Sequence, residues 1–143
     1  MGKEALDKIA TEVVDAALEV HRNLGPGLLE SAYEMALCHE LSLRGISFER
    51  QKAMNVRYKG VVLDCGYRID VIAGEEVLLE LKSCDQLSPV HEAQLLNYLK
   101  LADKQLGLLI NFNVRLLKHG LKRIVNGLEE SPREKVTCNS ATS

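Results

Sequence analysis

Two carboxylates and a lysine interrupt segments that otherwise read as buried strands. Asp70 lies in YRIDVIA, and Glu80 and Lys82 lie in VLLELKS. Burying a charge costs several kcal/mol unless it is paired or bound to a metal. Oxygen ligands without a nearby histidine or cysteine suit Mg²⁺ or Mn²⁺, and a Mg²⁺ site commonly combines carboxylates, waters and phosphate oxygens. These residues indicate metal-assisted phosphoryl chemistry, in which Lys82 would position or help to deprotonate a metal-bound water.

The spacing of Asp70 and Glu80 predicts that both acids share one face of a hairpin. In a hairpin centred on Glu75, Asp70 lies opposite Glu80, with Cβ atoms about 4.5–5.5 Å apart. Like charges at that distance destabilise a sheet, and a divalent cation would remove the conflict. A two-residue turn would instead send Glu80 to the other face, so this hypothesis requires an odd-length loop or a bulge near Gly74.

The same register places Arg68 opposite Lys82. One alternative for this region is a solvated hairpin face. Another is a purely structural α/β domain whose acids form ion pairs with these two cations. In that case Glu80→Gln would destabilise the protein, whereas in a metal-free metal site the change would relieve repulsion.

Three further residues are candidates because of their helical spacing. Glu30, in GLLESAYE, shares a face with Tyr33 and Leu37 at i, i+3 and i+7, so we expect it in a buried stripe. Gln94 and Tyr98 stand at i and i+4 and project together, where they would contact phosphate or base. The alternative is a structural role for this pair, in which Tyr98 lies at the boundary of the core beside Gln94 and neither residue contacts substrate.

Helical periodicity predicts two helices at the start of the chain. Apolar residues at steps of three and four indicate a helix over residues 4–24, and GPG at 25–27 ends it. A second helix should run from about Leu28 to about Arg44, before Gly45.

The period then changes to that of strands. Short apolar or alternating stretches from Ile46 to residue 83, separated by turn signals at 59–60 and 74–75, predict an antiparallel meander. Ser88 and Pro89 should open a helix over PVHEAQLLNYLKLA. LGLLINF (106–112) reads as a strand covered on both faces, and LKRIVN (121–126) as a further edge strand. The order is α-α-β-β-β-α-β with this final strand, an α/β fold with a mixed sheet flanked by helices.

Composition limits the class of protein. The chain has 143 residues, 46% hydrophobic and 27% charged, which indicates one soluble domain; we place it at 1–128. The aperiodic segment 129–143 should be a flexible tail. With no membrane span and no signal-peptide core, we expect a cytoplasmic protein without a membrane partner.

Cysteine usage and net charge exclude two further classes. The four cysteines are widely spaced without a C-x-x-C pair, which favours reduced thiols over a zinc site. The net charge of −2 argues against purely electrostatic binding of nucleic acid, although KHGLKR (118–123) forms a local basic patch.

The motifs together resemble the GxxExxY family. GLLESAYE fits that signature through Gly27, Glu30 and Tyr33, and YRID, LLELKS, HEAQLLNYL and GLLINF follow in the order typical of those proteins. The resemblance covers about residues 5–126. The GxxExxY family is similar to the PD-(D/E)xK nuclease superfamily, which implies a restriction-endonuclease-like core.

The resemblance implies a role for each candidate residue in the metal site. It assigns Asp70, Glu80 and Lys82 to the superfamily's Asp, Glu and Lys on adjacent strands, and the carbonyl of Leu81 to an additional metal ligand. It also implies that Glu30 completes the acidic cluster. We therefore expect Glu30 to be buried and to reach the cation, or a water bound to it, beside Asp70 and Glu80.

The resemblance extends to residues that would hold substrate. Gln94 and Tyr98 match the Q-x-x-x-Y motif of RecB-type exonucleases, which helps to hold DNA near the metal. Those members often have a histidine where this chain offers Glu30, so exonuclease polarity and strand preference are not carried over. Tyr33 and Arg68 are further expected substrate contacts.

These observations favour a nuclease that uses Mg²⁺ or Mn²⁺ to hydrolyse phosphodiester bonds, with DNA more expected than RNA. The alternative is a nucleic-acid-binding or assembly module that keeps the nuclease fold without cleaving. Short length and acidic balance favour the module slightly, since they leave little surface for a long DNA channel without a homodimer or partner protein. Metal affinity separates the two, because the module should show none.

Overall fold

The computed structural model describes residues 2–127, and the predicted tail at 129–143 lies outside the described residues. The predicted order of elements, including the final strand, is confirmed. A short 3₁₀ helix, Leu117–Gly120, precedes that last strand. The helices are α1 (Lys3–Leu24), α2 (Glu30–Leu43) and α3 (Pro89–Ala102), and the strands are β1 (Phe48–Tyr58), β2 (Val61–Ala73), β3 (Val77–Lys82), β4 (Leu106–Asn111) and β5 (Leu121–Val125).

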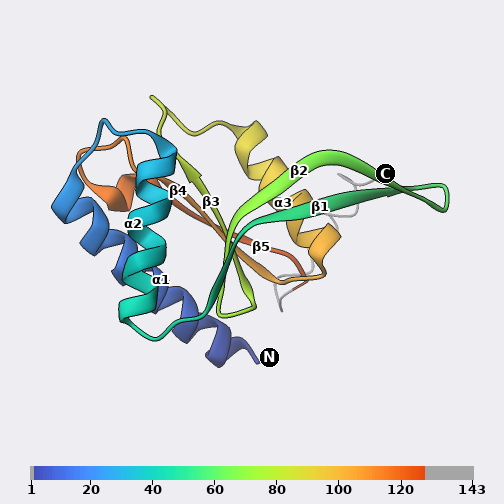
Figure 1. Ribbon diagram of the computed structural model, residues 1–143, viewed down its shortest axis with the longest axis horizontal. Helices are drawn as coiled ribbons and strands as arrows, with labels where there is room; N and C mark the ends of the chain where they lie inside the picture. Colours follow the sequence, from blue (N-terminus) through green and yellow to red (C-terminus); the bar gives the residue numbers. More distant parts are fainter. Residues whose placement is uncertain (1, 128–143) are drawn as a thin grey trace.

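The five strands form one mixed sheet in the order β1-β2-β3-β4-β5. The β3–β4 pair is parallel and is connected through α3, whereas the other pairs are antiparallel. Helices α1 and α2 cover one face of the sheet and α3 covers the other (Figure 1). Because β3 and β4 are covered on both faces, nearly every residue in them is buried. The predicted α/β class and restriction-endonuclease-like architecture are confirmed.

Two hydrophobic cores hold the layers together. The larger one joins α1 and α2 to the sheet, and the ring of Tyr33 stacks on Phe112 within it, with centroids 4.5 Å apart. The smaller one packs Leu95 and Leu99 of α3 against Leu78 and neighbouring strand residues. As predicted, α3 begins at Ser88 and Pro89, and Ser88 forms a capping box with the following turn.

Strands β1 and β2 extend well past the rest of the sheet as a two-stranded arm, here defined as residues 52–69 (Figure 1). Their turn has positive φ at both Lys59 and Gly60, as a two-residue type I′ turn requires. A bulge interrupts the arm where the register shifts between Met54 and Val56. Strand β2 pairs with β3 over just three of its residues, so the arm projects from the sheet beyond that pairing.

Other sequence expectations have direct structural counterparts. Cys38, Cys65 and Cys84 are free thiols, as predicted, and Cys138 lies outside the described residues. Within residues 2–127, no helix is both long and apolar enough to cross a membrane.

Candidate active site

The β2–β3 turn has the odd length that the candidate site requires. Gly74 and Glu75 adopt positive φ values of 57° and 64°, and Ala73 pairs with Val77 across a three-residue loop. The register therefore has the predicted centre, and the prediction that it brings Asp70 and Glu80 together is confirmed.

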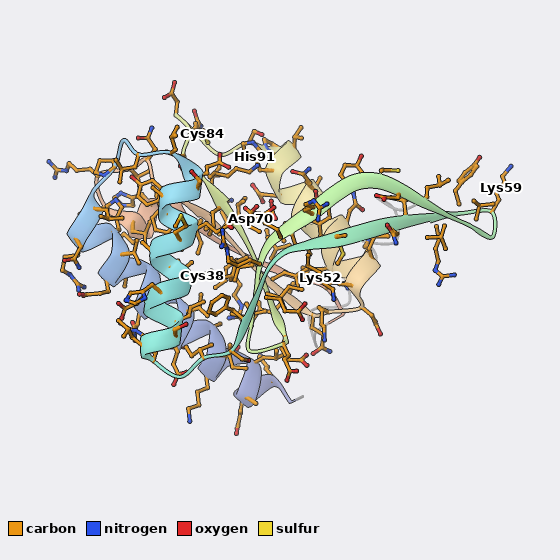
Figure 2. The ribbon with its side chains drawn as sticks, viewed as in Figure 1. Cys38, Lys52, Lys59, Asp70, Cys84 and His91 are labelled. Atoms are coloured by element: carbon orange, nitrogen blue, oxygen red, sulfur yellow. The ribbon has the colours of Figure 1, made fainter. Side chains whose placement is uncertain are left out.

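Asp70 and Glu80 lie where the β2–β3 ladder ends. The last backbone pair is Val71 with Leu79. One residue further, the Asp70 N–H donates to Glu80 Oε1 at 3.1 Å, and the Leu81 N–H donates to Asp70 Oδ2 at 2.8 Å. The carboxylates thus take the place of backbone acceptors as the strands separate. Figure 2 shows Asp70 near the centre of the molecule, between α2 and the arm.

The predicted opposition of Arg68 and Lys82 is wrong, because the β2–β3 ladder has ended before it reaches them. Arg68 pairs instead with Ala53 of β1 and donates to the Gln51 carbonyl at 3.3 Å. Lys82 is half-buried at the end of β3 and pairs with Asn111 of β4.

Burial dominates the electrostatics of the two acids. Glu80 is 6% exposed, and its burial, assisted by the charge of Asp70, raises the pKa of its carboxyl to about 8 against the opposing effect of Lys82. Burial also raises the pKa of Asp70, which the bond from the Leu81 N–H partly offsets. Such shifts of neighbouring carboxyls are typical of functional sites.

The acids are not neutralised by ion pairs. Within residues 2–127, the ion pairs include neither Asp70 nor Glu80. This arrangement disfavours a purely structural domain whose acids are paired with Arg68 and Lys82.

The prediction that Glu30 is buried is wrong. Glu30 is the first residue of α2 and is exposed. Long side chains on a helix lean toward its N-terminus, so Tyr33 covers the first turn. The Tyr33 hydroxyl donates to the Gly25 carbonyl at 2.6 Å and accepts the Leu28 N–H at 3.1 Å. The Glu30 charge still makes a small contribution to the raised pKa of both Asp70 and Glu80.

Sequence reasoning missed Glu34, the buried acid of α2. It lies one turn after Glu30, is 7% exposed and accepts bonds from Arg50 Nε at 3.0 Å and Gln51 Nε2 at 2.7 Å. The same Gln51 nitrogen lies 3.4 Å from Asp70 Oδ1, so one amide joins the two acids. The signal was present in GLLESAYE, but spacing does not tell which of its two glutamates turns inward.

The two predicted substrate residues on α3 lie together. Gln94 Nε2 donates to the Tyr98 hydroxyl at 3.2 Å. Tyr98 shares the smaller core with Leu78 of β3, and alternation along β3 puts Glu80 on the same face of the sheet as Leu78. Burial and then the charge of Glu80 raise the pKa of Tyr98.

Tyr33 does not fit the predicted contact with substrate. Its side chain is fully buried, its ring is stacked in the core, and both bonds of its hydroxyl hold the loop before α2. The predicted basic patch at 118–123 is partly neutralised, because Lys122 pairs with Glu92 and Arg123 pairs with Asp7.

The donor set of the site fits a hard divalent cation. Asp70 and Glu80 supply two adjacent carboxylates, and Mg²⁺ commonly uses one or two, completing its shell with waters and substrate oxygens. Within residues 2–127, no three histidine, cysteine or acidic side chains form a metal-binding group, so the expected three-carboxylate cluster with Glu30 is not present.

The amino-acid sequence also matches a known protein superfamily. A sequence model described as the PD-(D/E)XK nuclease superfamily matches residues 7–124. That span contains Glu30, Asp70, Glu80 and Lys82. Neither the curated proteins nor the solved structures include a significant match. The match identifies the superfamily and leaves the narrower GxxExxY assignment unconfirmed.

Proposed function

We propose that this chain, which belongs to the PD-(D/E)XK nuclease superfamily, is a nuclease that uses a divalent metal to hydrolyse phosphodiester bonds in nucleic acid. The main support is the pair of backbone bonds that hold these acids where β2 and β3 separate: Glu80 accepts the Asp70 N–H, and Asp70 accepts the Leu81 N–H. Mg²⁺ or Mn²⁺ is the proposed cation, DNA the preferred substrate, and the GxxExxY family the proposed subgroup.

In this proposal, Asp70, Glu80 and the Leu81 carbonyl would hold the cation. A bound cation would lower the pKa of a water and stabilise charge on the phosphate. Lys82 follows Glu80 by two residues on the same strand, where its ammonium would orient the attacking water and offset developing charge. Glu30 is exposed at the start of α2, so its proposed contact with the cation would run through a water.

The proposed substrate contacts are Gln94, Tyr98 and Arg68. The hydrogen-bonded pair on α3 lies on the face of the sheet that carries Glu80. Arg68 is exposed on β2, two residues before Asp70, where a guanidinium would bind a phosphate of the bound strand. Tyr33 has no place in this set and instead holds the loop before α2.

A non-cleaving module for nucleic-acid binding or assembly is the second candidate. It is favoured by the net charge of −2 and by exposed apolar side chains on the arm, such as Tyr58 and Val61, which would suit a homodimer or a protein partner. A module of that kind would have no need for two adjacent carboxylates, one buried and one half-buried, that form no ion pair within residues 2–127.

Cleavage of labelled DNA and RNA, single- and double-stranded, tests the proposal. Reactions with Mg²⁺, Mn²⁺ or chelator would compare the wild type with Asp70→Ala and Lys82→Ala. Asp15→Ala and Lys8→Ala, which change exposed residues of α1, are matched controls. We expect metal-dependent cleavage that is lost in the first two variants and kept in the controls. Equal cleavage by all variants would indicate a contaminant, and no cleavage of any substrate would favour the module.

A further inference from the structure

A groove of about 590 Å³ runs between α3 and the arm. Val56 and Tyr67 of the arm form one wall, and a stripe of α3 from Val90 to Leu101 forms the other. Its volume falls within the roughly 300–1,000 Å³ of typical small-molecule sites, so it has room for an unstacked nucleobase.

The groove contains two residues of the proposed active site. Gln94 and Tyr98 line it, and Tyr98 shares the smaller core with Leu78, on the face of β3 that carries Glu80. The ring of Tyr67 lies with its centroid 6.0 Å from that of Tyr98. A strand held at Glu80 by Gln94 and Tyr98 would therefore also lie against the groove.

The arm presents its apolar side chains to this groove. Cross-strand partners share a face, so Met54 and Tyr67 lie on one side of the arm, and Met54 packs in the core with α3. Arg68, the next residue along β2, lies on the other side with its partner Ala53. The wall facing α3 is therefore aromatic and aliphatic, and the basic side chain points away from it.

The chemistry of the lining matches bases better than phosphates. Among the described residues that line the groove, Lys100 is the single charged one, whereas a duplex presents phosphates that require several cations. Unpaired bases have apolar faces that stack on aromatic rings and polar edges that bond to amides. Tyr67 is 44% exposed and available for stacking, and Gln94 and Asn97 supply the amides.

We infer that this groove binds unpaired bases of a single-stranded nucleic acid, with Tyr67 as the stacking platform, Asn97 at the base edges and Lys100 on a phosphate. The inference rests on the proposed function and gives it a substrate class, single strands or frayed ends. It is tested by binding with chelator present, so its outcome is separate from that of cleavage.

Fluorescence anisotropy would measure the Kd of a labelled single-stranded DNA and of the matching duplex. Loss of base stacking, about 1–3 kcal/mol, predicts that Tyr67→Ala weakens single-strand binding about 5- to 150-fold and duplex binding much less. Tyr67→Phe keeps the ring and should bind within about twofold of the wild type. Tyr58→Ala is the matched control, since Tyr58 is 59% exposed on the same arm and lies outside the groove.

Three results would overturn the inference. The first is a wild type that does not bind single strands, and the second is an equal loss for both DNA forms in Tyr67→Ala. The third is a Tyr67→Ala variant with unchanged single-strand binding. In that case, sedimentation would show whether Tyr67→Ala dissociates a dimer. Dissociation would assign the groove to a second copy of the chain. Tyr67-dependent binding of single strands without cleavage would leave the inference standing and reject the nuclease.

Discussion

The amide N–H of Asp70 donates to the carboxylate of Glu80 at 3.1 Å, at the residue where β2 and β3 cease to pair. In return, Asp70 accepts the N–H of Leu81 at 2.8 Å. The two acids are thus held by backbone groups, and burial raises the pKa of each. Without a cation, each acid therefore holds its proton to a higher pH in the folded protein than in the unfolded chain, and this property leads to measurable consequences.

The metal-free protein should lose stability as the pH rises. The pKa of Glu80 is about 8 in the folded protein against an ordinary value of 4.5, so between these two pH values the folded state holds a proton that the unfolded state has released. The stabilisation is complete below pH 4.5 and is lost as the pH passes about 8. One such group changes the free energy of unfolding by up to about 1.4 kcal/mol per pH unit.

Urea unfolding in chelator across this pH range would measure the effect. Glu80→Gln should flatten the profile relative to the exposed-site control Glu75→Gln. If Glu80→Gln leaves the pH dependence of the unfolding free energy as it is in the wild type, Glu80 is not the source of that dependence.

Glu80→Gln should also stabilise the metal-free protein at pH 8. The amide removes a buried charge beside Asp70 while keeping the shape of the side chain, and we expect a gain of about 1–3 kcal/mol in the free energy of unfolding. Thermal and urea unfolding would measure it. Destabilisation by a similar amount would instead support an acid that serves as a structural ion-pair partner.

Lys82→Ala should abolish turnover while leaving metal binding intact. The ammonium is proposed to act on the attacking water and on the charge of the phosphate, so kcat should fall roughly 100-fold or more. Single-turnover cleavage together with Mn²⁺ titration would separate the two effects. Lys8→Ala on α1 controls for the loss of a positive charge, and normal cleavage by Lys82→Ala would mean that its assigned role is wrong.

Tyr33→Phe should affect stability and not chemistry. The change removes the hydroxyl that bonds Gly25 and Leu28, at a cost of about 1–3 kcal/mol in the free energy of unfolding. Cleavage per folded molecule should be unchanged. A fall in kcat/KM without loss of stability would restore Tyr33 as a substrate contact.

Local signals in the sequence predict much of the fold and the proximity of Asp70 and Glu80. The turn at Gly74 determines the register, and in a strand the register determines which side chains share a face. Ser88 and Pro89 similarly define the start of α3 through its capping bonds. Such features depend on neighbouring residues, so periodicity and turn chemistry are sufficient to predict them.

The remaining features depend on tertiary packing. Whether Glu30 or Glu34 is buried depends on where Tyr33 and Arg50 lie, and both positions are set by other elements. The alternation of residues in β2 and β3 likewise does not predict where the pairing of the two strands ends. That end keeps Arg68 and Lys82 from pairing. Nor does the sequence pattern reveal the groove, because α3 and the arm form its walls only after folding.

The most direct test of the metal centre is calorimetric titration of Mn²⁺ into the wild type, Glu80→Gln, and the control Glu75→Gln, at pH 8. Because Asp70 and Glu80 are proposed to supply both carboxylate ligands, the wild type and the control should bind one Mn²⁺ with the same affinity, and Glu80→Gln should lose that binding. Equal binding by all three proteins, or no binding by the wild type, would contradict a metal centre at Asp70 and Glu80.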